Sequence, residues 1–186
     1  MVAMDFSGEG LRYARQMGVN DPVQGDIRAL PFSDEAFDLV MSVDVLVHLP
    51  RGEEQAAARE LARVTRRGGL IALRVSALDI LRSRHGQFAH ERQRFTRRRL
   101  TELMEAAGIR VLRCSYANSL LMPVALAKFR IWEPLTRKAP QSGVQPVAPW
   151  LDRLLHAPLA VEAAWLSAGH DLPLGQSLML IGERIA

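Results

Sequence analysis

The sequence predicts an α/β protein built on a doubly wound, mostly parallel sheet. Short apolar runs alternate along the chain with segments in which apolar residues recur at helical spacing, the pattern of βαβ units. One such run, residues 37–43, is apolar apart from Asp38 and Ser42, as in a central parallel strand. The length of 186 residues, with 48% apolar and 24% charged residues, fits a single globular domain.

Residues 2–24 predict a strand, a capped helix and a second strand. The first strand is the apolar run 2–5. Ser7 can cap the following helix, and Gly18 ends it. The second strand is expected at residues 23–24. The inner face of the helix is expected to carry Leu11, Ala14 and Met17.

The middle of the chain continues this alternation. Strands are predicted at residues 37–43, 70–75 and 109–116, with helices at 53–66 and from a Thr96 cap to Gly108. The inward-facing residues expected on the two helices are Ala57, Leu61, Val64, Leu100, Leu103, Met104 and Ala107.

The alternation of predicted strands and helices ends after Asn118. Residues 120–133 predict a helix with Pro123 in its first turn, 136–149 a loop, and 150–167 a helix broken near Pro158. Residues 176–185 predict a strand that closes the sheet. We therefore expect one domain, with a core formed by 1–117 and 174–186 and a helical insertion at 118–173.

The amino-acid composition excludes several kinds of functional site. The single cysteine, Cys114, excludes an internal disulfide and a cysteine-rich metal site, and its apolar surroundings predict a buried, inert thiol. We predict no metal ligands. The sequence shows neither a signal peptide nor an apolar run long enough to span a bilayer, so a cytoplasmic location is expected.

Arginine is concentrated between Arg82 and Arg99, where seven arginines face one acid, Glu91. Such a segment can meet nucleic acid, anionic lipid or an acidic substrate. The alternative is a solvated loop and helix start.

Residues 25–49, GDIRALPFSDEAFDLVMSVDVLVHL, carry a more specific pattern. They closely resemble the class I S-adenosylmethionine-dependent methyltransferases, in particular the broad small-molecule group. The resemblance extends to Asp5-Phe6-Ser7, to ELARVTRRGGLI at 60–71, and to segments 95–111 and 173–180. It implies a Rossmann-like methyltransferase fold and S-adenosyl-L-methionine as cofactor.

The resemblance also implies a set of cofactor-binding residues. Asp5, at a strand end, would accept the ribose hydroxyls, and Phe6 would lie along the adenine. Asp26 would accept from the adenine amine, while the Ile27 amide donates to a ring nitrogen. Asp5 could instead be a helix N-terminal acid, and Asp26 a turn-forming residue.

Ser42 and Val43 follow in the resemblance as neighbours of the methionine end of the cofactor and of the substrate. Asp44 and His48 are the catalytic candidates. A histidine exchanges protons near neutral pH and can act as a general base. The alternative for His48 is a structural role in capping or stacking.

The resemblance also identifies what the sequence lacks. The family's first strand and its Gly-x-Gly-x-Gly turn are absent, and Ser7-Gly8-Glu9-Gly10 does not replace them, because only one helix separates Asp5 from Asp26. In the family's strand order, 3-2-1-4-5-7-6, that strand is the central one. We therefore expect an N-terminally truncated domain that binds S-adenosylmethionine weakly or not at all, and that can self-associate through its exposed core edge.

The predicted function is S-adenosylmethionine-dependent methyl transfer to a small-molecule or lipid-linked acceptor. One alternative is a non-catalytic interaction module derived from a methyltransferase. Another is an RNA-directed methyltransferase that uses the basic segment from Arg82 to Arg99.

Overall fold

The computed structural model describes residues 1–136 and 148–185 and begins with a small βαβ unit. Strands β1 (Met4–Asp5) and β2 (Val23–Gln24) are parallel and flank helix α1 (Gly8–Gln16). The Ser7 hydroxyl accepts from the Gly10 amide at 3.2 Å, which confirms the predicted cap. Met17 was predicted to face inward, but this was wrong: it lies beyond the last turn of α1 and is 85% exposed.

The main sheet has four strands in the order β3-β4-β6-β5. They are β3 (Phe37–Val43), β4 (Thr65–Ser76), β5 (Ile109–Ala117) and β6 (Ser177–Arg184). Strand β3 is parallel to β4, and β6 runs antiparallel to both of its neighbours. The predicted doubly wound α/β fold with a mostly parallel sheet is confirmed.

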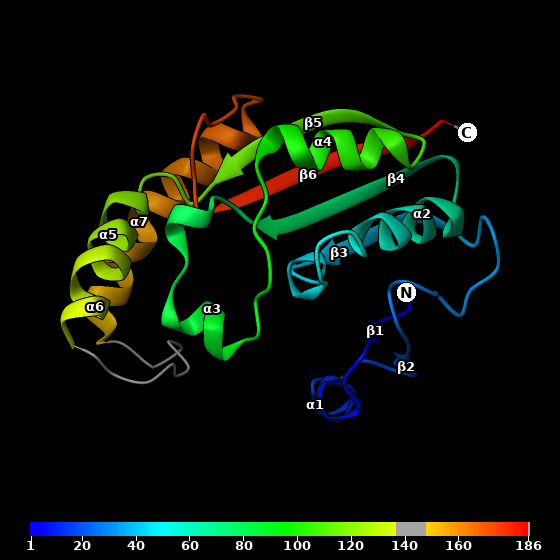
Figure 1. The fold of residues 1–186 in the computed structure, drawn as a ribbon, viewed down its shortest axis with the longest axis horizontal. Coiled ribbons are helices and arrows are strands. Elements are labelled where there is room, and N and C mark those ends of the chain that lie inside the picture. The colour runs from blue at the N-terminus through cyan, green and yellow to red at the C-terminus, as the bar shows by residue number, and fades with distance from the viewer. Residues whose placement is uncertain (137–147, 186) are drawn as a thin grey trace.

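Helices α2 (Glu54–Val64) and α4 (Arg97–Ala106) cover one face of this sheet (Figure 1). Helix α2 ends two residues before the predicted boundary, and β4 begins at Thr65. Phe95, two residues before α4, is fully buried in the hydrophobic core. The predicted inward residues of both helices are buried or half-buried; those with almost no exposure are Ala57, Leu61, Val64, Leu100 and Met104.

The other face of the main sheet is open beside β3. Leu39, Met41 and Val43 are each more than half exposed. Their register partners on β4 include Leu70, which is also exposed. Residues 37–43 were predicted to form a central strand, but β3 lies at an edge of the main sheet, and one of its faces is also uncovered.

Two short helical segments separate β4 from α4. These are η2 (Asp79–Leu81) and α3 (Arg84–Phe88). Helix α3 has only five residues, too few for a recurring apolar pattern, and it was not predicted from the sequence.

Four further helical segments lie between β5 and β6 among the described residues. They are α5 (Met122–Ala127), which continues as a π-helical turn η3 (Lys128–Trp132) into α6 (Glu133–Thr136), and α7 (Pro149–Ser167). Pro123 lies in the first turn of α5, as predicted. The break expected at Pro158 was wrong: α7 passes through it. The predicted loop 136–149 lies mainly outside the described residues.

The helices described here include none that is long and apolar enough to cross a membrane.

The strands of the βαβ unit and those of the main sheet form two separate sheets. In the family's strand order, 3-2-1-4-5-7-6, strands β2 and β1 correspond to strands 3 and 2. Strands β3, β4, β6 and β5 correspond to strands 4, 5, 7 and 6. Figure 1 shows β1 and β2 beside the β3 edge of the main sheet. Ile27 and Leu30, which follow β2, join the hydrophobic core.

Candidate functional site

Three acids follow the carboxyl ends of parallel strands. Asp5 ends β1, Asp26 lies two residues beyond β2, and Asp44 directly follows β3. Ligand sites in open α/β sheets lie outside this edge of the strands. The structure thus brings Asp5 and Asp26 to one sheet edge, while Asp44 belongs to the separate main sheet.

Asp5 lies at the start of α1. Its carboxylate oxygen Oδ1 accepts from the Ser7 amide at 2.7 Å, and the side chain is exposed. A Cβ atom on Gly10 would lie 3.5–3.6 Å from this carboxyl group, so the glycine leaves space beside it. Phe6, the next residue, is 73% exposed. Both residues are therefore accessible to a ligand.

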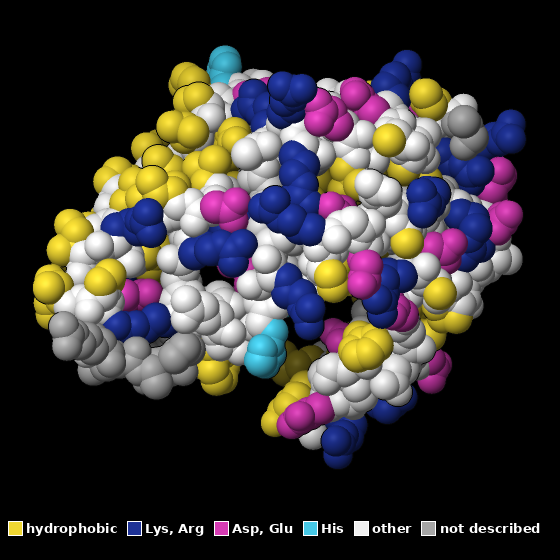
Figure 2. All heavy atoms as spheres, in the orientation of Figure 1, with side chains coloured by type: hydrophobic (Ala, Val, Ile, Leu, Met, Phe, Trp, Pro, Cys, Tyr) yellow, Lys and Arg dark blue, Asp and Glu magenta, His cyan; other side chains and the backbone are white. Residues whose placement is uncertain are grey.

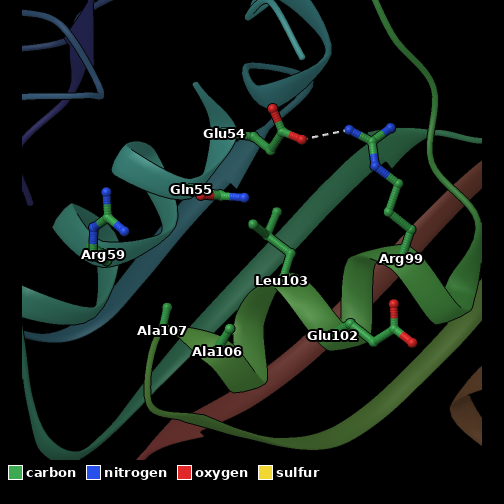
Figure 3. Close-up of a pocket in the computed structure, with 8 residues that line it drawn as sticks. All are labelled: Glu54, Gln55, Arg59, Arg99, Glu102, Leu103, Ala106 and Ala107. Carbon is green, nitrogen blue, oxygen red and sulfur yellow. Dashed lines mark hydrogen bonds and ion pairs between the residues drawn. The ribbon is translucent and has the colours of Figure 1, made fainter. Parts of the chain in front are cut away.

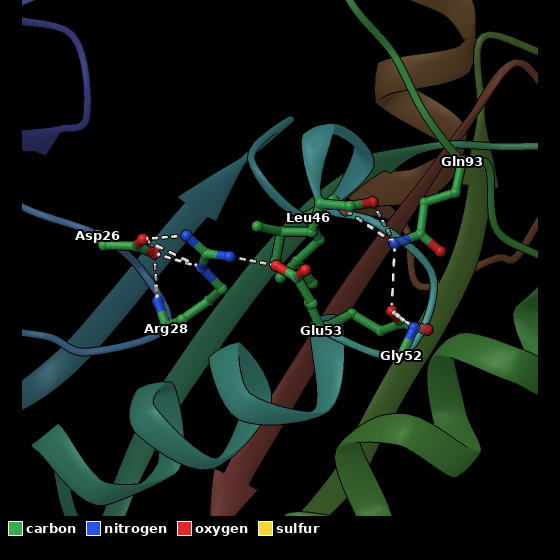
Figure 4. A network of polar contacts seen from close by, with 8 residues as sticks. Asp26, Arg28, Leu46, Gly52, Glu53 and Gln93 are labelled. Atoms are coloured by element: carbon green, nitrogen blue, oxygen red, sulfur yellow. Dashed lines mark hydrogen bonds and ion pairs between the residues drawn. The ribbon is translucent and has the colours of Figure 1, made fainter.

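Asp26 is held by its own neighbour, Arg28. The Arg28 amide donates to Asp26 Oδ1 at 2.9 Å, and the Arg28 guanidinium Nε lies 3.0 Å from each carboxylate oxygen. Arg28 also pairs with Glu53 at the start of α2 (Figure 4). The Arg28 hydrogen bonds lower the pKa of Asp26, so this carboxyl group is ionised at neutral pH. The turn predicted as the alternative for Asp26 is present.

The third strand ends in a strained turn. Asp44 has a φ of 54°, in the left-handed region that non-glycine residues rarely occupy. Its amide donates to the Arg74 carbonyl at 2.9 Å, and its carboxylate pairs with the Arg74 guanidinium at 3.0 Å. Strand β4 therefore holds Asp44 from both its backbone and its side chain.

Ser42 and Val43 point to opposite faces of β3. Ser42 is buried, and its hydroxyl has no hydrogen-bond partner among the described residues. Val43 lies on the open face. Only Ser42 therefore offers a buried polar atom.

His48 lies in the turn η1 (Leu46–His48) that follows Asp44. It is exposed, and its Nδ1 atom lies 3.4 Å from the His90 carbonyl oxygen. The neighbouring Val47 carbonyl accepts from the amides of Arg92 and Gln93. The segment 90–93, far from His48 in the sequence, thus holds this turn in place.

A network of buried polar side chains around Gln93 also contacts this turn (Figure 4). The Gln93 side-chain amide, fully buried, donates to the carbonyl of Leu49 at 2.9 Å and to that of Leu46 at 3.4 Å. Glu54 accepts from Gln93 at 3.3 Å and from Arg99 at 2.5 Å. Burial alone would raise the pKa of Glu54, but its hydrogen bonds outweigh burial and lower it.

Sequence reasoning missed the partners in these contacts. Arg28 could have been found, because an arginine two residues after an aspartate can close on it. Gln93, Glu54 and Arg74 gave no local signal, since their contacts join residues 30 or more positions apart.

A hollow of about 350 Å³ lies between α2 and α4 (Figure 3). The Glu54–Arg99 ion pair closes one end of it, and Leu103 lines its floor. Its other lining residues are Gln55, Arg59, Glu102, Ala106 and Ala107. None of the predicted site residues lines this hollow, so it is distinct from the strand ends.

Most arginines of the basic segment are engaged within the protein. Arg94 forms a buried ion pair with Glu91 at 2.8 Å, and Arg97 donates to the Leu172 carbonyl at 2.7 Å. The remaining contacts are Arg82 with Asp79, Arg84 with Glu133 and Thr136, Arg98 with Glu102, and Arg99 with Glu54. These contacts account for six of the seven arginines and tie the segment to the fold.

Cys114 is buried on β5, as predicted. Burial raises the pKa of its thiol, which keeps it protonated and unreactive at neutral pH.

The residues fit the implied adenosine cofactor in part. The exposed Asp5 carboxylate and the buried Ser42 hydroxyl both have capacity for a further hydrogen bond. Three N–H groups of Arg28 already donate to the Asp26 carboxylate, so an adenine amine would compete with them for its oxygens.

Comparison with known proteins agrees with this arrangement. Residues 1–73 match the family model of the methyltransferase domain. A protein of Encephalitozoon cuniculi (strain GB-M1), provisionally named a methyltransferase, is 43% identical over 76 residues. The match covers 40% of this chain and 36% of that protein, so the chain spans about a third of its relative.

Solved structures share the fold across nearly the whole chain. A SAM-dependent methyltransferase of Thermotoga maritima superposes with a TM-score of 0.61 at 17% identity, covering 98% of this chain and 72% of that one. The cyclase SpnF superposes with a TM-score of 0.57 at 19% identity, covering 100% and 66%. Residues 1–73 are thus similar to the methyltransferase domain, and the whole chain has the Rossmann-like fold of solved S-adenosylmethionine-dependent methyltransferases.

Proposed function

We propose that this protein takes part in S-adenosylmethionine-dependent methyl transfer to a small-molecule or lipid-linked acceptor. The observation that supports this is an acid at the carboxyl end of each of three parallel strands: Asp5 and Asp26 on the β1–β2 sheet, and Asp44 on the main sheet. We take residues 1–117 and 174–186 as the catalytic core and 118–173 as an insertion.

In this proposal Asp5 binds the ribose hydroxyls and Phe6 lies along the adenine. Asp26 and the Ile27 amide take the adenine edge once Arg28 moves toward Glu53, with which it is already paired. Ser42 and Val43 lie next to the methionine end.

Asp44 and His48 would flank the acceptor. When bound, S-adenosylmethionine supplies a methyl group already activated on a sulfonium, so acceleration comes chiefly from alignment of the acceptor. With Nδ1 directed to the His90 carbonyl, Nε2 of His48 is the ring atom that can take a proton from the acceptor.

The cofactor site can be tested by titration with S-adenosylhomocysteine, followed through the backbone amide resonances of the 186-residue chain. We expect weak, saturable binding, because the site residues are divided between two sheets. The amides of Ser7 and Ile27 should shift with it. Asp5→Asn should weaken binding roughly tenfold, since it removes half of a charged, two-oxygen acceptor. Asp21→Asn, on the loop before β2, is the matched control.

Shifts confined to the hollow between α2 and α4, or equal binding by Asp5→Asn and the wild type, would contradict the assignment.

A second candidate function is association through the main sheet, acting as an interaction module. The open face beside β3 favours it, because Leu39, Met41 and Val43 are more than half exposed there. Exposed apolar patches of this kind mark interaction surfaces. We infer that two copies can associate through this face and the adjacent edge of β3.

Sedimentation equilibrium tests the association. Met41→Glu should shift the protein toward monomer, while Tyr13→Glu on α1 should not. A wild-type protein that is monomeric at the highest accessible concentration would exclude this candidate.

A further inference from the structure

One side of α7 carries a stripe of exposed apolar side chains. On α7, Trp150, Leu154, Val161 and Trp165 are each more than half exposed. Together with the exposed Ala157 they recur at intervals of three or four residues, which places them on one side of the helix. The stripe extends over about 22 Å.

The opposite side of α7 already has its partners. Glu162 is buried there, and its carboxylate accepts from the backbone amides of Ser119 and Leu120 at 2.7 and 3.2 Å. Leu155 and Leu166 are half-buried on the same side. The stripe is therefore a second apolar face. A surface helix usually has one apolar face, packed on the core, and polar residues on the rest of its surface.

The segment α5–η3–α6 has a similar surface. Val124, Ile131, Trp132 and Leu135 are each more than half exposed, as is Leu120 just before α5. Figure 2 shows hydrophobic side chains gathered along the end of the molecule where these helices lie in Figure 1. We call the exposed residues of α5, η3, α6 and α7 the apolar ridge.

Exposed cations border the apolar ridge. Lys128 and Arg130 lie on either side of the half-buried Phe129, and Arg153 precedes Leu154 on α7. Among the described residues of the insertion, two acids are exposed. Asp152 lies beside Arg153, and Asp171 is held by Arg113 at 2.8 Å. The border is thus positive.

All three tryptophans of the chain, Trp132, Trp150 and Trp165, belong to this ridge. Tryptophan concentrates where one end of a side chain is apolar and the other is wet, as at the surface of a bilayer. Helices that lie in this layer combine an apolar face with lysine and arginine beside it. A protein interface would instead be depleted of lysine.

We propose that the apolar ridge docks the protein on an anionic lipid surface. The side chains of Trp150, Leu154 and Val161 enter the interfacial layer, and Lys128 and Arg153 contact the headgroups. This inference goes beyond the proposed methyl transfer and needs no cofactor, so failure of one leaves the other untouched.

Flotation and tryptophan emission test this with the full chain. The probes are vesicles of phosphatidylcholine and phosphatidylglycerol in equal parts, and vesicles of phosphatidylcholine alone. We expect flotation with the mixed vesicles and a blue shift of the emission, which reports on the ridge alone because no tryptophan lies elsewhere. Binding to phosphatidylcholine alone should be weaker, by roughly fivefold for each basic contact.

Two variants separate the apolar and charged contributions. Leu154→Gln with Val161→Gln should lower partitioning roughly tenfold or more, because two exposed apolar side chains no longer enter the membrane. Tyr13→Gln, an equally exposed apolar position on α1, should float like the wild type. Lys128→Gln with Arg153→Gln should remove most of the preference for mixed vesicles and, because both positions are exposed, should leave thermal unfolding unchanged.

Several outcomes would overturn the proposal. These are absence of flotation and blue shift for the wild type, or wild-type partitioning of either double variant. A wild-type dimer in solution that Leu154→Gln with Val161→Gln dissociates would assign the ridge to a second copy instead.

Discussion

Glu162 provides the sharpest test of how the insertion helices are attached to the core. Its carboxylate, 4% exposed, accepts from three backbone amides just before α5: those of Asn118, of Ser119 at 2.7 Å and of Leu120 at 3.2 Å. Asn118 has a φ of 58°, so the turn that presents these amides is itself strained. Glu162→Ala removes all three acceptor contacts at once.

The expected loss follows from these contacts. A hydrogen bond to a charged group contributes about 1.5–3 kcal/mol, so three would total several kcal/mol. Water can replace part of this, because Asn118 and Ser119 are only half-buried and the Leu120 contact is long. We therefore expect Glu162→Ala to lower the free energy of unfolding by about 3 kcal/mol.

Urea denaturation at pH 7 measures this loss. With a slope of about 2 kcal/mol per molar urea, the midpoint should fall by about 1.5 M. The matched control is Glu105→Ala, an exposed glutamate on α4, which should change stability by less than about 0.5 kcal/mol. Amide hydrogen exchange at Ser119 and Leu120 should accelerate in Glu162→Ala. Equal midpoints for Glu162→Ala and Glu105→Ala would refute the reasoning.

Three further outcomes are expected. Phe95→Ala should cost about 3–5 kcal/mol in thermal unfolding, because the ring is fully buried, while Phe88→Ala, 51% exposed, should cost far less. Gly175→Ala should destabilise the entry to β6, since its Cβ would lie 2.3 Å from the Ala117 carbonyl oxygen; a midpoint equal to wild type would contradict this. The folded-state pKa of Glu54 lies below its usual 4.5, so its stabilising contribution is present above about pH 4.5 and lost as pH falls through the folded value. Urea midpoints of wild type and Glu54→Gln should therefore converge on acidification.

The helices and strands were largely predictable because their signals are local. The cap at Ser7 and the apolar spacing of Leu61 and Leu100 depend on residues within one or two turns. Met17 and Pro158 were misjudged for the converse reason. Whether a residue at a helix end packs, or a proline interrupts a long helix, depends on neighbours elsewhere in the chain.

The candidate site was predictable only as a set of positions. Asp5, Asp26 and Asp44 each lie at a strand end, as the sequence indicated. Which of these carboxylates are paired was not predictable. The Asp5 carboxylate remains accessible, whereas Asp26 forms an ion pair with Arg28 and Asp44 forms one with Arg74. The structure also shows that the Ser42 hydroxyl is buried and has no hydrogen-bond partner among the described residues.

The sequence by itself determined the order and type of most elements, because hydrophobic periodicity and motif spacing are carried by neighbouring residues. Only the tertiary structure decided which faces stay open and which charges are paired. Those outcomes depend on contacts such as Gln93 with Leu46, or Glu162 with Ser119, more than 40 positions apart. The same packing that buried one side of α7 left its tryptophans exposed, because a helix can press only one of its apolar faces against the core.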